Sequence, residues 1–181
     1  MNIFGDHSIS CTRAGDIITR HNRNRNLVGR VSEDGHLSPE LEKLGILGDQ
    51  GYGDMRRPGD ITLPVWAKGK GLAIDVAVID PLNKTNLKSV DACEQYAADQ
   101  KHGKYDASFV GSNYDFTVMV FETTGGVCAE GQDILRQLFR FAAKQTKTRY
   151  CVYAARAWAR VSVSVQRSVT QQILNRMVFE S

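Results

Sequence analysis

The stretch from Arg57 to Ile79 reads RPGDITLPVWAKGKGLAIDVAVI, and it decides the fold that the rest of the chain completes. Residues 60–66 and 72–79 are rich in β-branched and apolar side chains, and residues 67–71 (AKGKG) between them are typical of a turn. The pattern predicts a β-hairpin with one strand on each side of this short basic turn.

The second predicted strand carries an aspartate at its centre. Side chains alternate along a strand, so Asp75 shares its face with Ala73 and Ala77, while the branched side chains point the other way. A carboxylate in a buried strand costs several kcal/mol unless a partner or a metal compensates it. Asp60 begins the neighbouring strand, so the two acids could hold one divalent cation, Mg²⁺ or Mn²⁺, with the Val76 carbonyl as a further ligand. This arrangement predicts metal-dependent hydrolysis of a phosphodiester.

The remaining segments predict an α/β domain. Helices are expected over residues 14–28, 88–105, 132–145 and 150–177, and a third strand over 115–122. The last helix is the least regular, because Val161 to Val165 alternates like a strand. A strand that follows a helical crossover is expected to lie parallel to an earlier strand. The prediction is therefore a small mixed sheet flanked by helices.

The domain divides into four parts. Residues 1–28 hold a basic helix, and 29–59 form a long connection with one short helix around 39–44. Residues 60–125 form the core of hairpin, helix and strand, and residues 126–181 supply C-terminal helices that pack on it.

The helix predicted at 88–105 places two lysines on the stripe that faces the sheet. Lys101 and Lys104 follow Cys93 and Ala97 at helical spacing. Either lysine could stabilise the charge that develops on a phosphate at the acid pair, position the attacking water, or act as the catalytic base. The alternative is that both snorkel along the helix end. Glu122, which ends the third strand, is a further candidate metal ligand or a solvated strand-end acid.

Composition bounds the function only loosely. The chain has 181 residues and a net charge of +3, with no apolar run long enough for a membrane span and no pattern of a signal peptide at its start. Its four cysteines are scattered, so no disulfide framework is expected.

Two basic zones stand out, one around residues 13–30 and one around 144–160. They predict contacts with a nucleic-acid backbone or, alternatively, solvated helix faces. The expected backbone contacts are Arg13, Arg20, His21, Arg23 and Arg25. For His21, a structural role inside the fold is the alternative.

Five short motifs in order resemble the restriction-like endonuclease domain of site-specific non-LTR retrotransposons, a PD-(D/E)xK nuclease. They are the His-Cys pair His7 and Cys11, the RHN element at 20–22, RPGD at 57–60, the strand LAIDVAV with Asp75, and KHGKY at 101–105. The resemblance covers roughly residues 5–125.

This resemblance implies a restriction-endonuclease-like fold and Mg²⁺-dependent cleavage of DNA at a target site. It also implies an intracellular, nuclear location and a reverse transcriptase domain and element RNA as partners on a longer polyprotein. Asp60 and Asp75 would be the metal ligands, Lys101 or Lys104 the catalytic lysine, and Tyr105 would orient a phosphate.

The sequence departs from the family pattern at three points. One residue separates Pro58 from Asp60, the position two residues after Asp75 is not a lysine, and the first cysteine pair of the zinc knuckle is missing. A structural Zn²⁺ takes about four protein ligands, so either a longer chain completes the site begun by His7 and Cys11, or the knuckle has decayed. Two alternatives stay open: a DNA-binding relic without catalysis, and a structural or interaction domain in which Lys68, Lys70 or Lys101 merely neutralises the aspartates.

Overall fold

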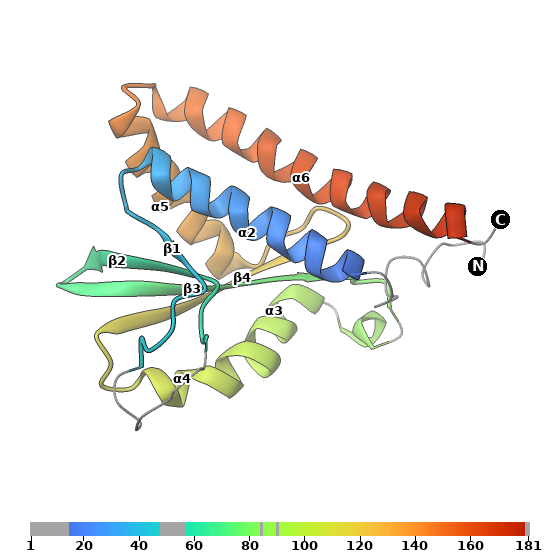
Figure 1. The fold of residues 1–181 in the computed structure, drawn as a ribbon, viewed down its shortest axis with the longest axis horizontal. Coiled ribbons are helices and arrows are strands. Elements are labelled where there is room, and N and C mark those ends of the chain that lie inside the picture. The colour runs from blue at the N-terminus through green and yellow to red at the C-terminus, as the bar shows by residue number, and fades with distance from the viewer. Residues whose placement is uncertain (1–14, 48–56, 84, 90, 180–181) are drawn as a thin grey trace.

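A four-stranded sheet lies between two helical layers in the computed structural model, which describes residues 15–47, 57–83, 85–89 and 91–179 (Figure 1). One face of the sheet is covered by α2 (Asp16–Asp34) and α5 (Ala129–Gln145), and α6 (Tyr150–Phe179) packs against these two helices. The other face is covered by a continuous run of α3 (Ala92–Tyr96), the π-helical segment η3 (Ala97–His102) and α4 (Gly103–Phe109), preceded by the short 3₁₀ turn η2 (Asn86–Lys88). The mixed α/β class predicted from the sequence is confirmed.

The sheet has the strand order β1-β2-β3-β4, with β1 (Glu40–Leu41), β2 (Ile61–Ala67), β3 (Lys70–Ile79) and β4 (Tyr114–Glu122). The β2–β3 pair is antiparallel, and Lys68 and Gly69 in its turn have positive φ angles of 51° and 79°. The β3–β4 pair is parallel and places Asp75 opposite Val118. The predicted hairpin and the predicted parallel third strand are therefore both confirmed.

The two faces of β3 pack against different layers, as the alternation of its side chains predicts. Leu72, Ile74 and Val76 join the core formed with α2, α5 and α6. Ala73 and Ala77 face the opposite layer of α3, η3 and α4. Because these two side chains are small, the helices of that layer approach the sheet closely beside Asp75.

Helix α2 is longer than the sequence predicts, since it continues through residues 29–34, which were expected to belong to a connection. Val28 and Val31 extend the buried stripe by helical spacing, and Gly29 lies where an added Cβ would come within 3.5 Å of Leu41. The short helix expected around residues 39–44 is absent from the described chain, where β1 occupies Glu40–Leu41 instead. Polar Ser, Glu and Asp side chains near the helix end resemble a loop in composition, and tertiary burial overrides that local signal.

The helices of the C-terminal third agree with prediction. Val161 and Val165 are buried one turn apart on α6, which explains why a strand-like alternation still forms a helix. Within the described ranges, no helix combines the length and hydrophobicity that a membrane crossing requires. Cys93, Cys128 and Cys151 are free thiols, and Cys11 lies outside the described residues.

Candidate metal and phosphodiester site

Three hydrogen bonds hold Asp60 in place, two with the backbone of β3 and one with His21 of α2. Its backbone N–H donates to the carbonyl of Ile74 at 2.9 Å. Its carboxylate accepts from the Val76 N–H, with 2.6 Å between N and Oδ2. His21 of α2 lies 3.1 Å from the other carboxylate oxygen, Nε2 to Oδ1. The acid is therefore fixed in one orientation, with its side chain directed at the backbone beside Asp75.

Gly59 permits this close approach. A Cβ at position 59 would lie 3.0 Å from the Cβ of Ala73 and 3.4 Å from its Cα. Those atoms belong to the central strand, which cannot move aside without breaking its pairing. The residue inserted between Pro58 and Asp60 is thus small for a steric reason.

Asp75 forms an ion pair with Lys101 across the space between β3 and η3. The Lys101 Nζ lies 2.7 Å from Oδ2 of Asp75, and the two side chains are 17% and 11% exposed. That buried oxygen has the Lys101 ammonium group as its partner, and the carboxyl group of Asp60 is a further neighbour of the Asp75 carboxyl group. A carboxylate oxygen has two lone pairs, so it can accept from Lys101 and still bind a further ligand.

The two carboxyl groups differ in their affinity for protons. Burial is the main reason that the pKa of Asp75 rises to about 6; Lys101 opposes the rise and the charge of Asp60 adds to it. Burial also acts to raise the pKa of Asp60, but the bond and charge of His21 and the N–H of Val76 outweigh it and lower that pKa. Burial lowers the pKa of Lys101, but Asp75 more than offsets this effect and the pKa is raised. Environments that give two neighbouring carboxyl groups different pKa values are typical of functional sites.

The donor set of this site fits a hard divalent cation. Asp60 and Asp75 offer carboxylate oxygens, and the Val76 carbonyl points to the same strand edge as the Val76 N–H that binds Asp60. Among the described residues no three His, Cys, Asp or Glu side chains cluster as a complete metal cage. Mg²⁺ is the ion suited to such a site, because it is usually bound by one or two carboxylates and keeps several waters.

The structure brings Lys101, and not Lys104, to the acids. Residues 97–102 form a π-helical segment, in which the i→i+5 hydrogen bonds change the phase of the helix. The exposed Lys104 consequently lies 4.8 Å above the ring of Tyr105, and Tyr105 packs against Phe116. Isolated π-turns are frequent at functional sites.

Glu122 does not reach the acid pair. The parallel register places Glu122 opposite Ile79, four residues along β3 from Asp75, which corresponds to about 13 Å. Its Oε2 instead accepts a hydrogen bond from the Thr124 hydroxyl at 2.9 Å.

The predicted backbone-binding residues of α2 separate into buried and exposed groups. Arg20 is 4% exposed and donates to Gln172 and to the Val78 carbonyl. Arg25 is 8% exposed and pairs with Glu42. His21 contacts Asp60, and Arg23 is exposed. Arg13, His7 and Cys11 lie outside the described residues, so the structure does not place them.

A polar pocket of about 510 Å³ opens farther along β3, between α2 and the α3–η3 run. Its lining includes Arg20 and Gln100, the sequence neighbours of His21 and Lys101, together with Asp80 and Tyr96. The pocket begins at Val78, three residues or about 10 Å from Asp75.

Two features of the site could not be predicted from the sequence. The need for glycine at position 59 depends on the short distance to Ala73. Its only sequence signal is the departure from the family motif, in which no residue separates the proline from the aspartate. The role of His21 as the partner of Asp60 depends on how α2 lies across the sheet, which no local motif records.

Comparison of the sequence with models of known protein families and with curated proteins finds no match.

Proposed function

We propose that this chain is a metal-dependent endonuclease that hydrolyses a phosphodiester bond of DNA, with a restriction-endonuclease-like core. The observation that carries the proposal is the convergence of Asp60, Asp75 and Lys101 on one point of the sheet, with 2.7 Å between Lys101 and Asp75. Phosphodiester hydrolysis needs oxygen ligands for a cation and a positive charge near the phosphate. The two carboxylates supply the first, and the ammonium group of Lys101 supplies the second. The ordered motifs that resemble the nuclease domain of non-LTR retrotransposons support the same proposal.

The roles of the residues follow from their environments. Asp60 and Asp75, with the Val76 carbonyl, would hold Mg²⁺ or Mn²⁺. The bound ion would supply Lewis-acid charge and lower the pKa of water. The pKa of Lys101 is raised, so its ammonium group stays protonated at neutral pH. We therefore assign Lys101 to stabilising charge on the phosphate rather than to accepting a proton. His21 acts on Asp60 as a positioning residue, because its contact is with that carboxylate.

Hydrolysis in this site would add a water oxygen to phosphorus and break one phosphorus–oxygen bond to a sugar. The proposed products are a phosphate terminus and a free hydroxyl. Lys101 lies on the α3–η3–α4 side of β3, so the phosphate is expected to approach from that side.

The experiment that tests this function is cleavage of supercoiled plasmid by the purified chain, in Mg²⁺ or Mn²⁺ against EDTA. We expect metal-dependent nicking that Asp75→Asn abolishes. Asp115→Asn is the matched control, because Asp115 is an exposed β4 carboxylate paired with Lys70 at 3.2 Å. Equal cleavage by Asp75→Asn would place any nuclease activity elsewhere.

A second candidate function is DNA binding without catalysis. The observation that favours it is the ion pair itself, because a lysine 2.7 Å from Asp75 compensates that carboxylate without requiring a cation. Such a protein would bind DNA equally well in Mg²⁺ and in EDTA and would not cut it. A purely structural domain would show neither binding nor cleavage, and neither DNA nor metal would raise its Tm.

A further inference from the structure

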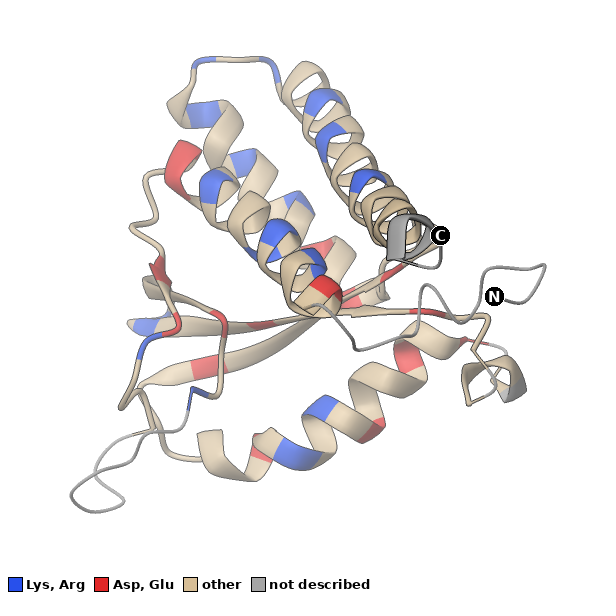
Figure 2. Cartoon of the chain, turned by 45° about the vertical axis from the view of Figure 1, so that its right-hand side comes forward, with Lys and Arg blue, Asp and Glu red and all other residues tan. Residues whose placement is uncertain are grey.

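The helical layer opposite Lys101 carries an unbalanced positive charge. Helices α2, α5 and α6 together contain 11 of the 23 Lys and Arg residues and 5 of the 20 Asp and Glu residues. The five acids lie near the helix ends, and Figure 2 shows Lys and Arg spread over the three helices. The rest of the chain is correspondingly acidic, so charge is divided between two parts of a protein whose net charge is only +3.

A groove of about 830 Å³ runs between α2 and α6 on this layer. The two helices are antiparallel, since Asp16 bonds Asn175 at one end and Asp34 lies 3.8 Å from Arg160 at the other. Four arginines line the groove, two on each wall and each pair two helical turns apart: Arg23 and Arg30 on α2, Arg160 and Arg167 on α6. Each pair therefore spans about 10 Å along the groove.

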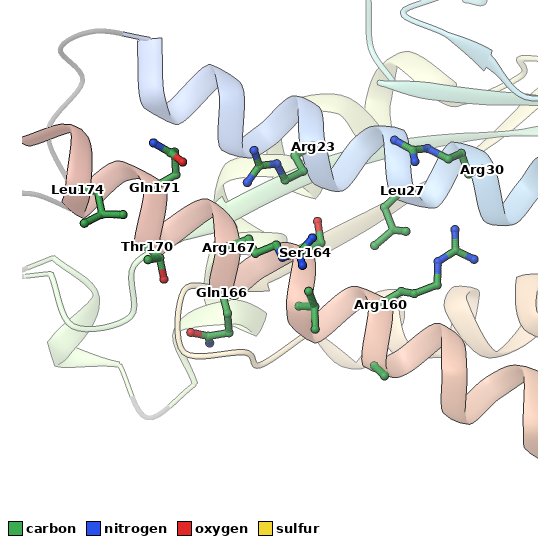
Figure 3. A pocket seen from close by; sticks show the side chains of 12 residues that line it. Arg23, Leu27, Arg30, Arg160, Ser164, Gln166, Arg167, Thr170, Gln171 and Leu174 are labelled. Carbon is green, nitrogen blue, oxygen red and sulfur yellow. The ribbon is translucent and has the colours of Figure 1, made fainter.

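The arginines have little counter-charge within the protein. Arg160 has only the distant contact with Asp34, and no described acid forms an ion pair with the exposed Arg23, Arg30 or Arg167. Figure 3 shows Arg160 extending from α6 toward α2, and Arg30 lying along the facing part of α2. Like charges in one groove repel one another, and a polyanion between them would remove that repulsion.

Apolar side chains lie between the arginines. Leu27 forms part of the floor, and Val163 and Leu174 in the lining are 47% and 49% exposed. A duplex presents mainly sugar and phosphate at its rim, whereas a single strand also presents base faces that can cover apolar surface and stack on guanidinium planes. Arginines that follow a backbone beside exposed apolar groups thus suit a single strand better than a duplex.

We propose that the α2–α6 groove binds single-stranded DNA, with its four arginines on the phosphates and its apolar residues under the bases. This surface lies on the opposite side of the sheet from Lys101 and has no residue in common with the candidate metal site. The inference extends the proposed nuclease function by a second contact with nucleic acid. Its test needs no metal and no cleavage.

The test is fluorescence anisotropy of a labelled single-stranded DNA oligomer in EDTA, over a range of salt concentrations. Replacing Arg23, Arg30, Arg160 and Arg167 together with Gln should weaken binding at least tenfold. It should also reduce the slope of log affinity against log salt by about 3, because each phosphate contact in a single strand contributes about 0.7. The matched control replaces four exposed basic residues around the α5–α6 turn with Gln: Arg140, Lys144, Lys147 and Arg149.

A second pair of variants leaves every arginine in place. Val163→Glu puts a negative charge in the groove and should weaken binding, whereas Val152→Glu, on the same helix outside the groove lining, should not. Equal loss in the control quadruple variant would overturn the proposal in favour of diffuse attraction. Absence of binding by the parent chain, or tighter binding of a duplex or of RNA with the same sequence, would overturn it as well. Failure of nuclease activity alone, with Asp75→Asn still binding the oligomer, would leave the groove assignment intact.

Discussion

Lys101 and Asp75 meet at 2.7 Å although they lie on different layers, one in the π-helical segment and the other on the central strand. The pair is largely buried, and removal of one partner from a buried pair leaves an uncompensated charge. The proposed site depends on this relationship, because it fixes the position of the ammonium group and opposes the rise that burial causes in the pKa of the carboxylate.

Lys101→Met should abolish metal-dependent cleavage, since the stabilising charge at the phosphate is lost. Asp75 would become a lone buried carboxylate, so we also expect a lower free energy of unfolding, by about 3 kcal/mol at neutral pH. Cleavage rates and urea unfolding measure the two effects. Lys104→Met, which removes the exposed lysine over Tyr105, should leave cleavage near the parental rate. Equal loss in both variants would contradict the assignment of Lys101.

His21→Gln should weaken the site without destroying it. His21 orients the Asp60 carboxylate and helps to lower its pKa. Without that contact, Asp60 holds a cation less well, so we expect a several-fold rise in the Mg²⁺ concentration that gives half-maximal cleavage. The maximal rate at saturating Mg²⁺ should change less. A rate that falls at all Mg²⁺ concentrations alike would indicate instead that His21 acts on the substrate.

Gly59→Ala should disturb the site through sterics alone. The added methyl group meets the Cβ of Ala73 at 3.0 Å. We expect a loss of stability of about 1–2 kcal/mol, typical of overpacking, together with weaker metal binding as Asp60 shifts. Gly103→Ala is the control, because Gly103 has a helical φ of −55° and its nearest atom to an added Cβ is 3.4 Å away. Thermal unfolding of both variants compares the two; a neutral Gly59→Ala would contradict the close approach.

A second histidine should make stability depend on pH. His102 bridges Asp106 and Glu130 at 2.8 and 2.7 Å, and Glu130 also accepts from Thr117. Burial lowers the pKa of His102, but these bonds outweigh it and raise the pKa. The protonated form is therefore favoured by folding, so its contribution is complete below the unfolded value near 6.5 and is lost as pH rises through the folded pKa.

His102→Gln should consequently destabilise the protein more at pH 6 than at pH 9, by on the order of 1 kcal/mol. Urea unfolding at the two pH values measures this difference. His36→Asn is the control, since it removes an exposed histidine of positive φ (56°), a conformation that Asn tolerates. A difference between parent and His102→Gln that stays constant with pH would contradict the bridging role.

Much of the fold could be predicted because it rests on strong local periodicity. The hairpin around residues 67–71 and the two faces of β3 follow from alternation, and α5 and α6 follow from long segments without Gly or Pro. The extent of α2 and the identity of β1 could not be predicted in this way. The polar residues that end α2 look like a loop, and a two-residue strand such as Glu40–Leu41 is stabilised only by its pairing with β2.

Some residues of the candidate site could likewise be predicted from the sequence, and others could not. Asp75 could be found because a carboxylate among β-branched residues is anomalous in the sequence itself. The choice between Lys101 and Lys104 could not be made, since a π-helical segment changes the phase of the helix at that point. The α2–α6 groove could not be predicted either, because Arg30 and Arg160 lie far apart in sequence and come to line one groove only through the antiparallel packing of the two helices.

The most direct test of the central claim is calorimetric titration of the purified chain with Mn²⁺, alongside Asp60→Asn and Asp75→Asn. If the two carboxylates hold one cation, the parent chain binds one Mn²⁺ and each variant loses that binding while retaining its cooperative unfolding. Binding of Mn²⁺ that is unchanged in both variants, or no binding by the parent chain, would contradict the proposal that Asp60 and Asp75 form a metal site.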